Sequence, residues 1–152
     1  LEPAEIPFEA GNRAPLYALS VEGETLDIGV VSMGNPHAVI EVPHIASAPV
    51  ERLGPAIESN PRFPARVNAG FMEIVDRTHI RLRVYERGAG ETLACGTGAC
   101  AAVVSGRLQG QLDESVCVQL PGGKLVVSWP GEGQPVRLNG PASFVFEGNI
   151  EI

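Results

Sequence analysis

The sequence predicts an α+β fold in which a mostly antiparallel or mixed sheet wraps around one central buried helix. Two observations lead to this class. Short β-forming segments separated by glycine, proline and asparagine turns recur along the chain, whereas residues 99–109 form a run of small and aliphatic residues whose only charge is Arg107 near its end. A helix that is apolar on every face must be buried, and the surrounding strands are the elements that can cover it.

The individual elements follow from local patterns of turns and alternation. Ile80, Leu82 and Val84 alternate with polar residues and predict a half-buried strand, and the same count places Glu86 in phase with the buried side. A short helix is predicted at 55–59 with Pro55 in its first turn. We expect strands at 16–21, 24–33, 38–42, 71–75, 78–87, 116–120, 124–129, 136–138 and 142–146.

Composition and charge narrow the classes of function. The chain has 152 residues, which is the size of one domain, and its net charge of −7 disfavours a broad nucleic-acid surface. The sequence has no long apolar run that would span a membrane, and its three cysteines, an odd number, fit a reducing compartment such as the cytoplasm. Scattered histidines and cysteines predict no metal site, and no phosphate-binding loop motif is present.

The start of the central helix is the segment with the clearest chemical character. Cys95-Gly96-Thr97-Gly98 precedes the apolar run, and Gly110 is placed to end the helix. A buried helix start offers unpaired N–H groups and a partial positive charge, so we expect it to bind an anionic group. The same environment is expected to lower the pKa of the Cys95 thiol.

The other two cysteines have plainer interpretations. Cys100 lies five residues further along the same helix and is expected to face packing, and Cys117 lies in an alternating strand. At this stage two functions remain open for the helix start. One is catalysis by an activated thiol, and the other is a non-catalytic module that binds a carboxylate or phosphate.

Four sequence blocks together resemble the diaminopimelate epimerase family. They are GNPH at 34–37, NAGFM at 68–72, RVYERGAGET at 83–92 and ACGTGACAA at 94–102. The resemblance spans essentially the whole chain but only the second half of the family's protein. Together with a first residue that is leucine, this predicts that the chain is a piece of a longer polypeptide.

The resemblance implies a protein of two similar lobes, each a sheet around a central helix, with the substrate between them and one catalytic cysteine from each lobe. It implies interconversion of LL- and meso-diaminopimelate without pyridoxal phosphate or metal, toward lysine and peptidoglycan. In this scheme residues 1–13 are a linker, 14–143 are the C-terminal catalytic lobe, and 144–152 are a terminal strand that returns to the N-terminal lobe.

The same resemblance assigns roles to individual residues. Cys95 matches the cysteine of the second lobe, and His37 is either part of the active-site wall or a polar residue that satisfies its neighbours. The expected substrate-binding residues are Asn35, Asn68, Glu86, Arg87, Gly96 and Thr97. Arginine can grip a carboxylate through two hydrogen bonds, and N–H groups at a helix start stabilise charge that develops on a carboxylate.

Inversion at a carbon atom needs one group to remove the proton and another to return it on the opposite face. The chain offers one such thiol, so we expect it to be inactive without its N-terminal lobe. The expected partners are that lobe and diaminopimelate, and the apolar C-terminal tail leaves a homodimer open. The alternatives are a non-catalytic anion-binding module and a related isomerase similar to proline racemase.

Overall fold

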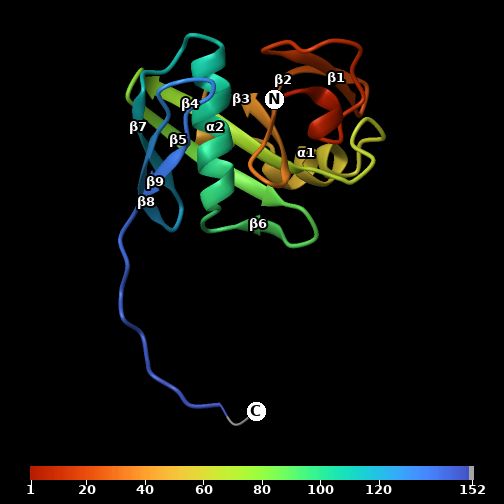
Figure 1. Cartoon of the computed structure of the whole chain (residues 1–152). Helices are drawn as coiled ribbons and strands as arrows, with labels where there is room; N and C mark the ends of the chain where they lie inside the picture. Colours follow the sequence, from red (N-terminus) through yellow and green to blue (C-terminus); the bar gives the residue numbers. More distant parts are fainter. Residues whose placement is uncertain (151–152) are drawn as a thin grey trace.

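The computed structural model describes residues 1–150 and contains one nine-stranded sheet with two α-helices and two short 3₁₀ helices in that range. Figure 1 shows their arrangement. The strands are β1 (Tyr17–Val21), β2 (Glu24–Ser32), β3 (Pro36–Glu41), β4 (Asn68–Asp76), β5 (His79–Glu86), β6 (Gly90–Thr92), β7 (Ser115–Leu120), β8 (Gly123–Ser128) and β9 (Arg137–Asn139). The helices are α1 (Val50–Glu58) and α2 (Gly96–Leu108), with 3₁₀ turns at Pro3–Glu5 and Ile45–Ser47.

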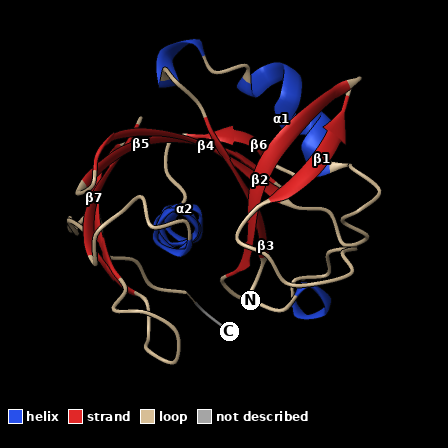
Figure 2. Cartoon of the chain, turned by 90° about the horizontal axis from the view of Figure 1, so that it is seen from above, coloured by secondary structure: helices blue, strands red, loops and turns tan. Residues whose placement is uncertain are grey.

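The sheet is mixed and strongly curved. Its strand order is β1-β2-β3-β4-β5-β7-β8-β9, with β6 paired to β5. The β3–β4 and β5–β7 pairs are parallel, and the other pairs are antiparallel. Viewed from above, the sheet bends around α2, which lies inside the curve (Figure 2). The predicted fold class, a mixed sheet around one central buried helix, is therefore confirmed.

The core inside the curve is built from the small residues of α2 and the apolar face of the sheet. Ala99, Ala101 and Val103 are fully buried on the helix, and the alternating residues of β5 face them. The helix ends as its sequence predicts. Gly110 has φ +74°, and its N–H donates to the carbonyl of Arg107 while Gln111 donates to Gly106, which is the Schellman arrangement.

A second core lies on the outer side of the sheet, where α1 and the N-terminal segment cover β1 to β4. Ile6 and Phe8 are buried in it, so the expected linker 1–13 packs on an apolar surface, partly as the Pro3–Glu5 turn. Helix α1 turns Val50, Leu53 and Ile57 toward the same core. The single sheet thus separates two apolar layers.

Both helices begin earlier than predicted. Helix α1 spans Val50–Glu58 rather than 55–59, so Pro55 lies inside it and not in the first turn. Pro55 cannot donate to the carbonyl of Glu51, and this is tolerated because Glu51 is exposed to water. Helix α2 starts at Gly96 rather than at residue 99, since enclosure by the sheet overrides the helix-weakening effect of glycine.

The structure also differs from the prediction at β6 and at the C-terminal tail. Strand β6 was not expected, because three residues that begin with glycine carry no readable alternation. Residues 142–146 were expected to form a strand, but the chain has no strand between 140 and 150, and Phe144 and Phe146 are about 80% exposed. A β-forming sequence needs a strand edge to pair with, and within the described residues this tail extends away from the sheet (Figure 1). The last two residues of the expected terminal strand, 151–152, lie outside the described residues.

Helix α1 approaches β5 closely because residue 54 has no side chain. A Cβ atom on Gly54 would lie 2.5 Å from Cγ of Tyr85. Although alanine is favoured over glycine in a helix by about 1 kcal/mol, overpacking costs about 1–3 kcal/mol. Three atoms of Tyr85 would lie within 2.8 Å of the new Cβ, so the upper part of this range applies. We therefore expect Gly54→Ala to lower the free energy of unfolding in urea by about 1–2 kcal/mol after the alanine preference is subtracted. Gly11→Ala is the control, since nothing lies within 4 Å of its Cβ, and a Gly54→Ala variant as stable as the wild type would contradict the packing argument.

Candidate active site

Cys95 is the residue that precedes α2, and it has extended backbone angles of φ −136° and ψ 104°. No side chain caps the helix start, and the first bond within the helix runs from the N–H of Ala99 to the carbonyl of Cys95. The N–H groups of Gly96 and Thr97 therefore have no carbonyl partner within the helix. This end of α2 combines a thiol with available amide donors.

Packing explains why residue 98 is glycine, and the sequence alone did not show this. A Cβ atom at this position would lie 3.0 Å from Cγ2 of Val84 and 3.2 Å from the Cys95 sulfur. The thiol and β5 therefore take up the space in which a side chain at residue 98 would lie.

The Cys95 thiol contacts polar groups although its residue is only 5% exposed. The sulfur donates to Oε2 of Glu86 at 3.2 Å and lies 3.6 Å from Oγ1 of Thr97. The other carboxylate oxygen of Glu86, Oε1, accepts a hydrogen bond from the Thr92 hydroxyl at 2.5 Å. Glu86 lies on the inner side of β5, as the alternation along that strand predicts, and on this side it contacts the thiol.

The expected lowering of the Cys95 pKa is wrong for this chain. Burial is the largest influence and raises the pKa of the thiol, and the hydrogen bond to the Glu86 carboxylate raises it further. The hydroxyl of Thr97 and the N–H of Gly98 lower it, but these effects are outweighed. The thiol therefore keeps its proton near neutral pH.

A second chain of polar contacts runs from the helix start to the interior. Asn35 Nδ2 lies 3.5 Å from the Thr97 hydroxyl, and its Oδ1 lies 3.1 Å from Nε2 of His37. His37 is fully buried, and this burial lowers its pKa from 6.5 to about 4. The neutral imidazole therefore serves as a hydrogen-bonding partner behind Asn35.

Asn68 and Arg87 form a separate contact at the end of β5. Asn68 is buried, its Oδ1 accepts from the backbone N–H of Arg87 at 2.9 Å, and its Nδ2 donates to the carbonyl of Pro36. The Arg87 side chain is exposed and donates to the carbonyl of Ala65 at 2.8 Å. Asn68 thus fixes the backbone from which the Arg87 guanidinium extends.

Comparison with known sequences shows the family of this chain. The family model described as diaminopimelate epimerase matches residues 29–145. The chain belongs to the diaminopimelate epimerase family. It is 66% identical over 152 residues to the diaminopimelate epimerase of Alkalilimnicola ehrlichii and 63% identical over 153 residues to that of Thioalkalivibrio sulfidiphilus. These alignments cover 100% of this chain but 54% and 55% of the relatives, so it spans about half of their length.

Solved structures support the family fold. A Bacillus anthracis phenazine biosynthesis protein of the PhzF family aligns with a TM-score of 0.52 at 17% identity, covering 81% of this chain and 38% of its own. An Enterococcus faecalis protein of the same family also gives 0.52 at 18% identity, covering 77% and 40%. At this level of identity the likeness concerns the fold alone.

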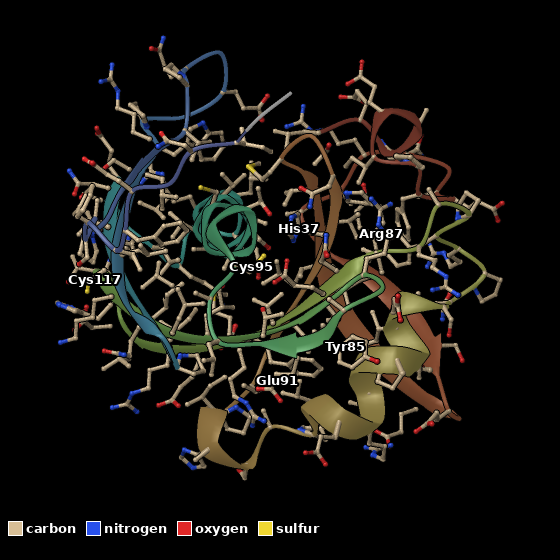
Figure 3. All side chains as sticks on the ribbon, turned by 90° about the horizontal axis from the view of Figure 1, so that it is seen from below. His37, Tyr85, Arg87, Glu91, Cys95 and Cys117 are labelled. Atoms are coloured by element: carbon tan, nitrogen blue, oxygen red, sulfur yellow. The ribbon has the colours of Figure 1, made fainter. Side chains whose placement is uncertain are left out.

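The structure brings most of the predicted site residues of this epimerase-family chain to one end of α2. Cys95, Thr97, Glu86 and Asn35 are joined by direct contacts, and Gly96 lies between them. Figure 3 shows Cys95 at the near end of α2, with His37 and Arg87 on the side where β3 and β4 pass. Cys117 lies on β7, on the face of the sheet away from α2 (Figure 3), whereas the alternation of its strand left a core and a surface position open.

Sequence reasoning missed two side chains that support the site. Thr92 was overlooked because β6 was not predicted, and it contacts Glu86 from that strand. Glu58, at the end of α1, is 8% exposed and accepts the N–H of Gly88 at 2.8 Å, next to Arg87. The sequence feature that points to Glu58 is its position, because it is a charged residue on the face of α1 that is otherwise apolar.

Residues 1–150 contain no group of three or more His, Cys, Asp or Glu side chains arranged to hold a metal ion. In the same range, neither helix is long and apolar enough to cross a lipid bilayer.

The buried imidazole predicts a pH dependence of stability. Because the pKa of His37 falls from 6.5 to about 4 on folding, the unfolded chain takes up the proton first, and stability is lost as the pH falls from 6.5 toward 4. We expect this residue to remove about 2 kcal/mol between pH 7 and pH 5. His37→Gln should flatten that part of the profile in urea unfolding, whereas the exposed His44→Gln should not. Parallel profiles for wild type and His37→Gln would refute the assignment.

Proposed function

We propose that this chain is the C-terminal half of a cofactor-independent cytoplasmic epimerase that interconverts LL- and meso-diaminopimelate, for lysine and peptidoglycan synthesis. In this proposal Cys95 is one of two thiols that exchange a proton at Cα. The observation that carries it is the Cys95 thiol at the start of α2, in contact with Glu86 and beside the amides of Gly96 and Thr97. The family membership supports the substrate class.

The first requirement of this reaction is to stabilise the carbanion formed at Cα. Loss of the Cα proton places negative charge on the adjacent carboxylate. The N–H groups of Gly96 and Thr97, at the positive end of a buried helix, are suited to bind that carboxylate without reorganisation. Removal of one such donor in other enzymes costs about 2.7–4 kcal/mol, which is enough to decide whether a site is active.

The second requirement is a group that gives or takes the proton. With its raised pKa, the Cys95 thiol starts as the acid and donates its proton to the carbanion. Glu86 accepts the hydrogen bond from the thiol, so its carboxylate is placed to exchange that proton with the sulfur. These contacts favour a role for Glu86 at the reacting carbon.

The distant end of diaminopimelate carries a second carboxylate and ammonium group. Arg87 is exposed at the end of β5 and can form two hydrogen bonds with that carboxylate once it leaves the carbonyl of Ala65. Asn68 holds the Arg87 backbone, and Asn35 offers a half-buried amide near Thr97. Such groups distinguish diaminopimelate from an amino acid with a single carboxylate, which favours it over the substrate of a proline-racemase-like isomerase.

The proposal is tested in a two-lobed protein. We suggest a chimera in which the part of the Alkalilimnicola ehrlichii relative that this chain does not match is joined in front of residue 1. Because general acid–base groups contribute about 10²–10⁴-fold, Cys95→Ser should lower kcat/KM for epimerisation of LL-diaminopimelate by at least about 100-fold. Cys117→Ser is the matched control and should keep the activity. Equal activity of the two variants would refute the role of Cys95.

The chain alone supplies a second test. Since inversion needs a proton-transfer group on each face of Cα, residues 1–152 by themselves should not exchange the Cα proton of diaminopimelate in deuterated water at a rate near that of the chimera. The measurement is the ¹H NMR signal of the Cα proton over time. A comparable rate would overturn the two-lobe proposal. If the chain binds diaminopimelate yet the chimera is also inactive, the non-catalytic anion-binding alternative is favoured.

A further inference from the structure

Thr92 forms a close contact at the candidate site to which neither the family comparison nor the sequence assigns a role. Its hydroxyl donates to Oε1 of Glu86 at 2.5 Å, while Oε2 of the same carboxylate faces the Cys95 sulfur at 3.2 Å. A separation of 2.5–2.7 Å is typical of a hydroxyl that donates to an ionised carboxylate. The Glu86 carboxylate is thus held between a hydroxyl and a thiol.

The pairing of β5 with β6 explains how Thr92 reaches this position. Glu86 lies directly opposite Gly90, and Thr92 lies opposite Val84, so Thr92 and Glu86 are diagonal neighbours on the same face. The Thr92 hydroxyl can therefore cross to the carboxylate.

The backbone around Thr92 is fixed from both sides. Before it, β6 is hydrogen-bonded to β5. After it, the carbonyl of Leu93 accepts the N–H of Gly122 at 2.7 Å, which ties the connection between β6 and α2 to the turn between β7 and β8. A hydroxyl on such a segment keeps its position. It can therefore hold the carboxylate of a glutamate, whose side chain otherwise rotates about three bonds.

We propose that Thr92 is a positioning residue that holds the carboxylate of Glu86 so that Oε2 stays on the Cys95 thiol. The inference rests on the proposed function, which assigns the proton transfer to Cys95, and deepens it by adding a residue that acts through Glu86. Without the Thr92 hydroxyl the carboxylate is released from one end and spends part of its time away from the sulfur. The negative charge of the carboxylate then lies near the sulfur for less of the time, so it raises the pKa of the Cys95 thiol less than in the wild type.

The first test needs no catalysis and uses the chain of residues 1–152. Iodoacetamide reacts with the thiolate, so its rate at Cys95 reports how readily the thiol loses its proton. We expect Thr92→Val, which keeps the shape and removes the hydroxyl, to speed alkylation of Cys95 at pH 7 by roughly 3- to 10-fold. Thr92→Ser should react as the wild type does, and Glu86→Gln should show the same acceleration or a larger one.

Alkylation at Cys100, located separately by peptide fragmentation in a mass spectrometer, is the internal control for unfolding. Cys100 is half-buried on the same helix, so general opening of the structure would speed both thiols, whereas release of Glu86 speeds Cys95 alone. Thr25→Val, on the exposed side of β2, is the matched control variant and should behave as the wild type. The inference fails if Thr92→Val reacts at the wild-type rate or slower, if Cys100 accelerates equally, or if Thr92→Ser is as altered as Thr92→Val.

The second test uses the two-lobed chimera and separates positioning from binding. Thr92→Val should lower kcat by roughly tenfold with KM changed less than about twofold, because the residue acts on proton transfer and not on the substrate. Thr92→Ser should restore kcat. A chimera that is inactive with wild-type residues at Cys95 and Thr92 would count against the proposed function alone, since the alkylation result stands without it. A rise in KM with kcat unchanged would overturn the positioning role.

Discussion

The need to enclose α2 is the constraint from which the rest of the structure follows. Its buried face is made of glycine, alanine, valine and serine, so strands can approach it closely only if they curve around it. The contact is tight at Gly29, where a Cβ atom would lie 1.8 Å from the hydroxyl of Ser105. Because the helix is held along its whole length, its first turn and Cys95 take a fixed position at the end of the sheet.

That position sets two physical effects against each other at the thiol. The start of a helix favours a thiolate, and the N–H of Gly98 and the hydroxyl of Thr97 act in the same direction. Burial and the Glu86 carboxylate act in the opposite direction and prevail, so the pKa of Cys95 is raised. The site is thereby suited to deliver a proton, and the charge of Glu86 becomes a control on the reactivity of the sulfur.

The elements that sequence could predict are those whose signal is local. Strand β5 was predicted nearly to its ends because Ile80, Leu82 and Val84 alternate, and Gly110 marked the end of α2 through its backbone preference. Helix α1 begins before the predicted range although Val50, Leu53 and Ile57 have helical spacing, because a proline such as Pro55 is typical of a first turn and here lies inside the helix. The strand expected at 142–146 did not form, since pairing requires an edge that the sequence cannot supply alone.

Local patterns are enough to predict that a buried helix follows the glycine-rich turn after Cys95, and that Glu86 lies on the inner side of its strand. Both follow from periodicity and glycine placement within a few residues. The folded structure is needed to show that the thiol stays protonated, that Asn68 holds the Arg87 backbone, and that Thr92 reaches Glu86. These depend on burial and on contacts between separate strands and helices, and no local pattern encodes the depth of a side chain or the partner across a sheet.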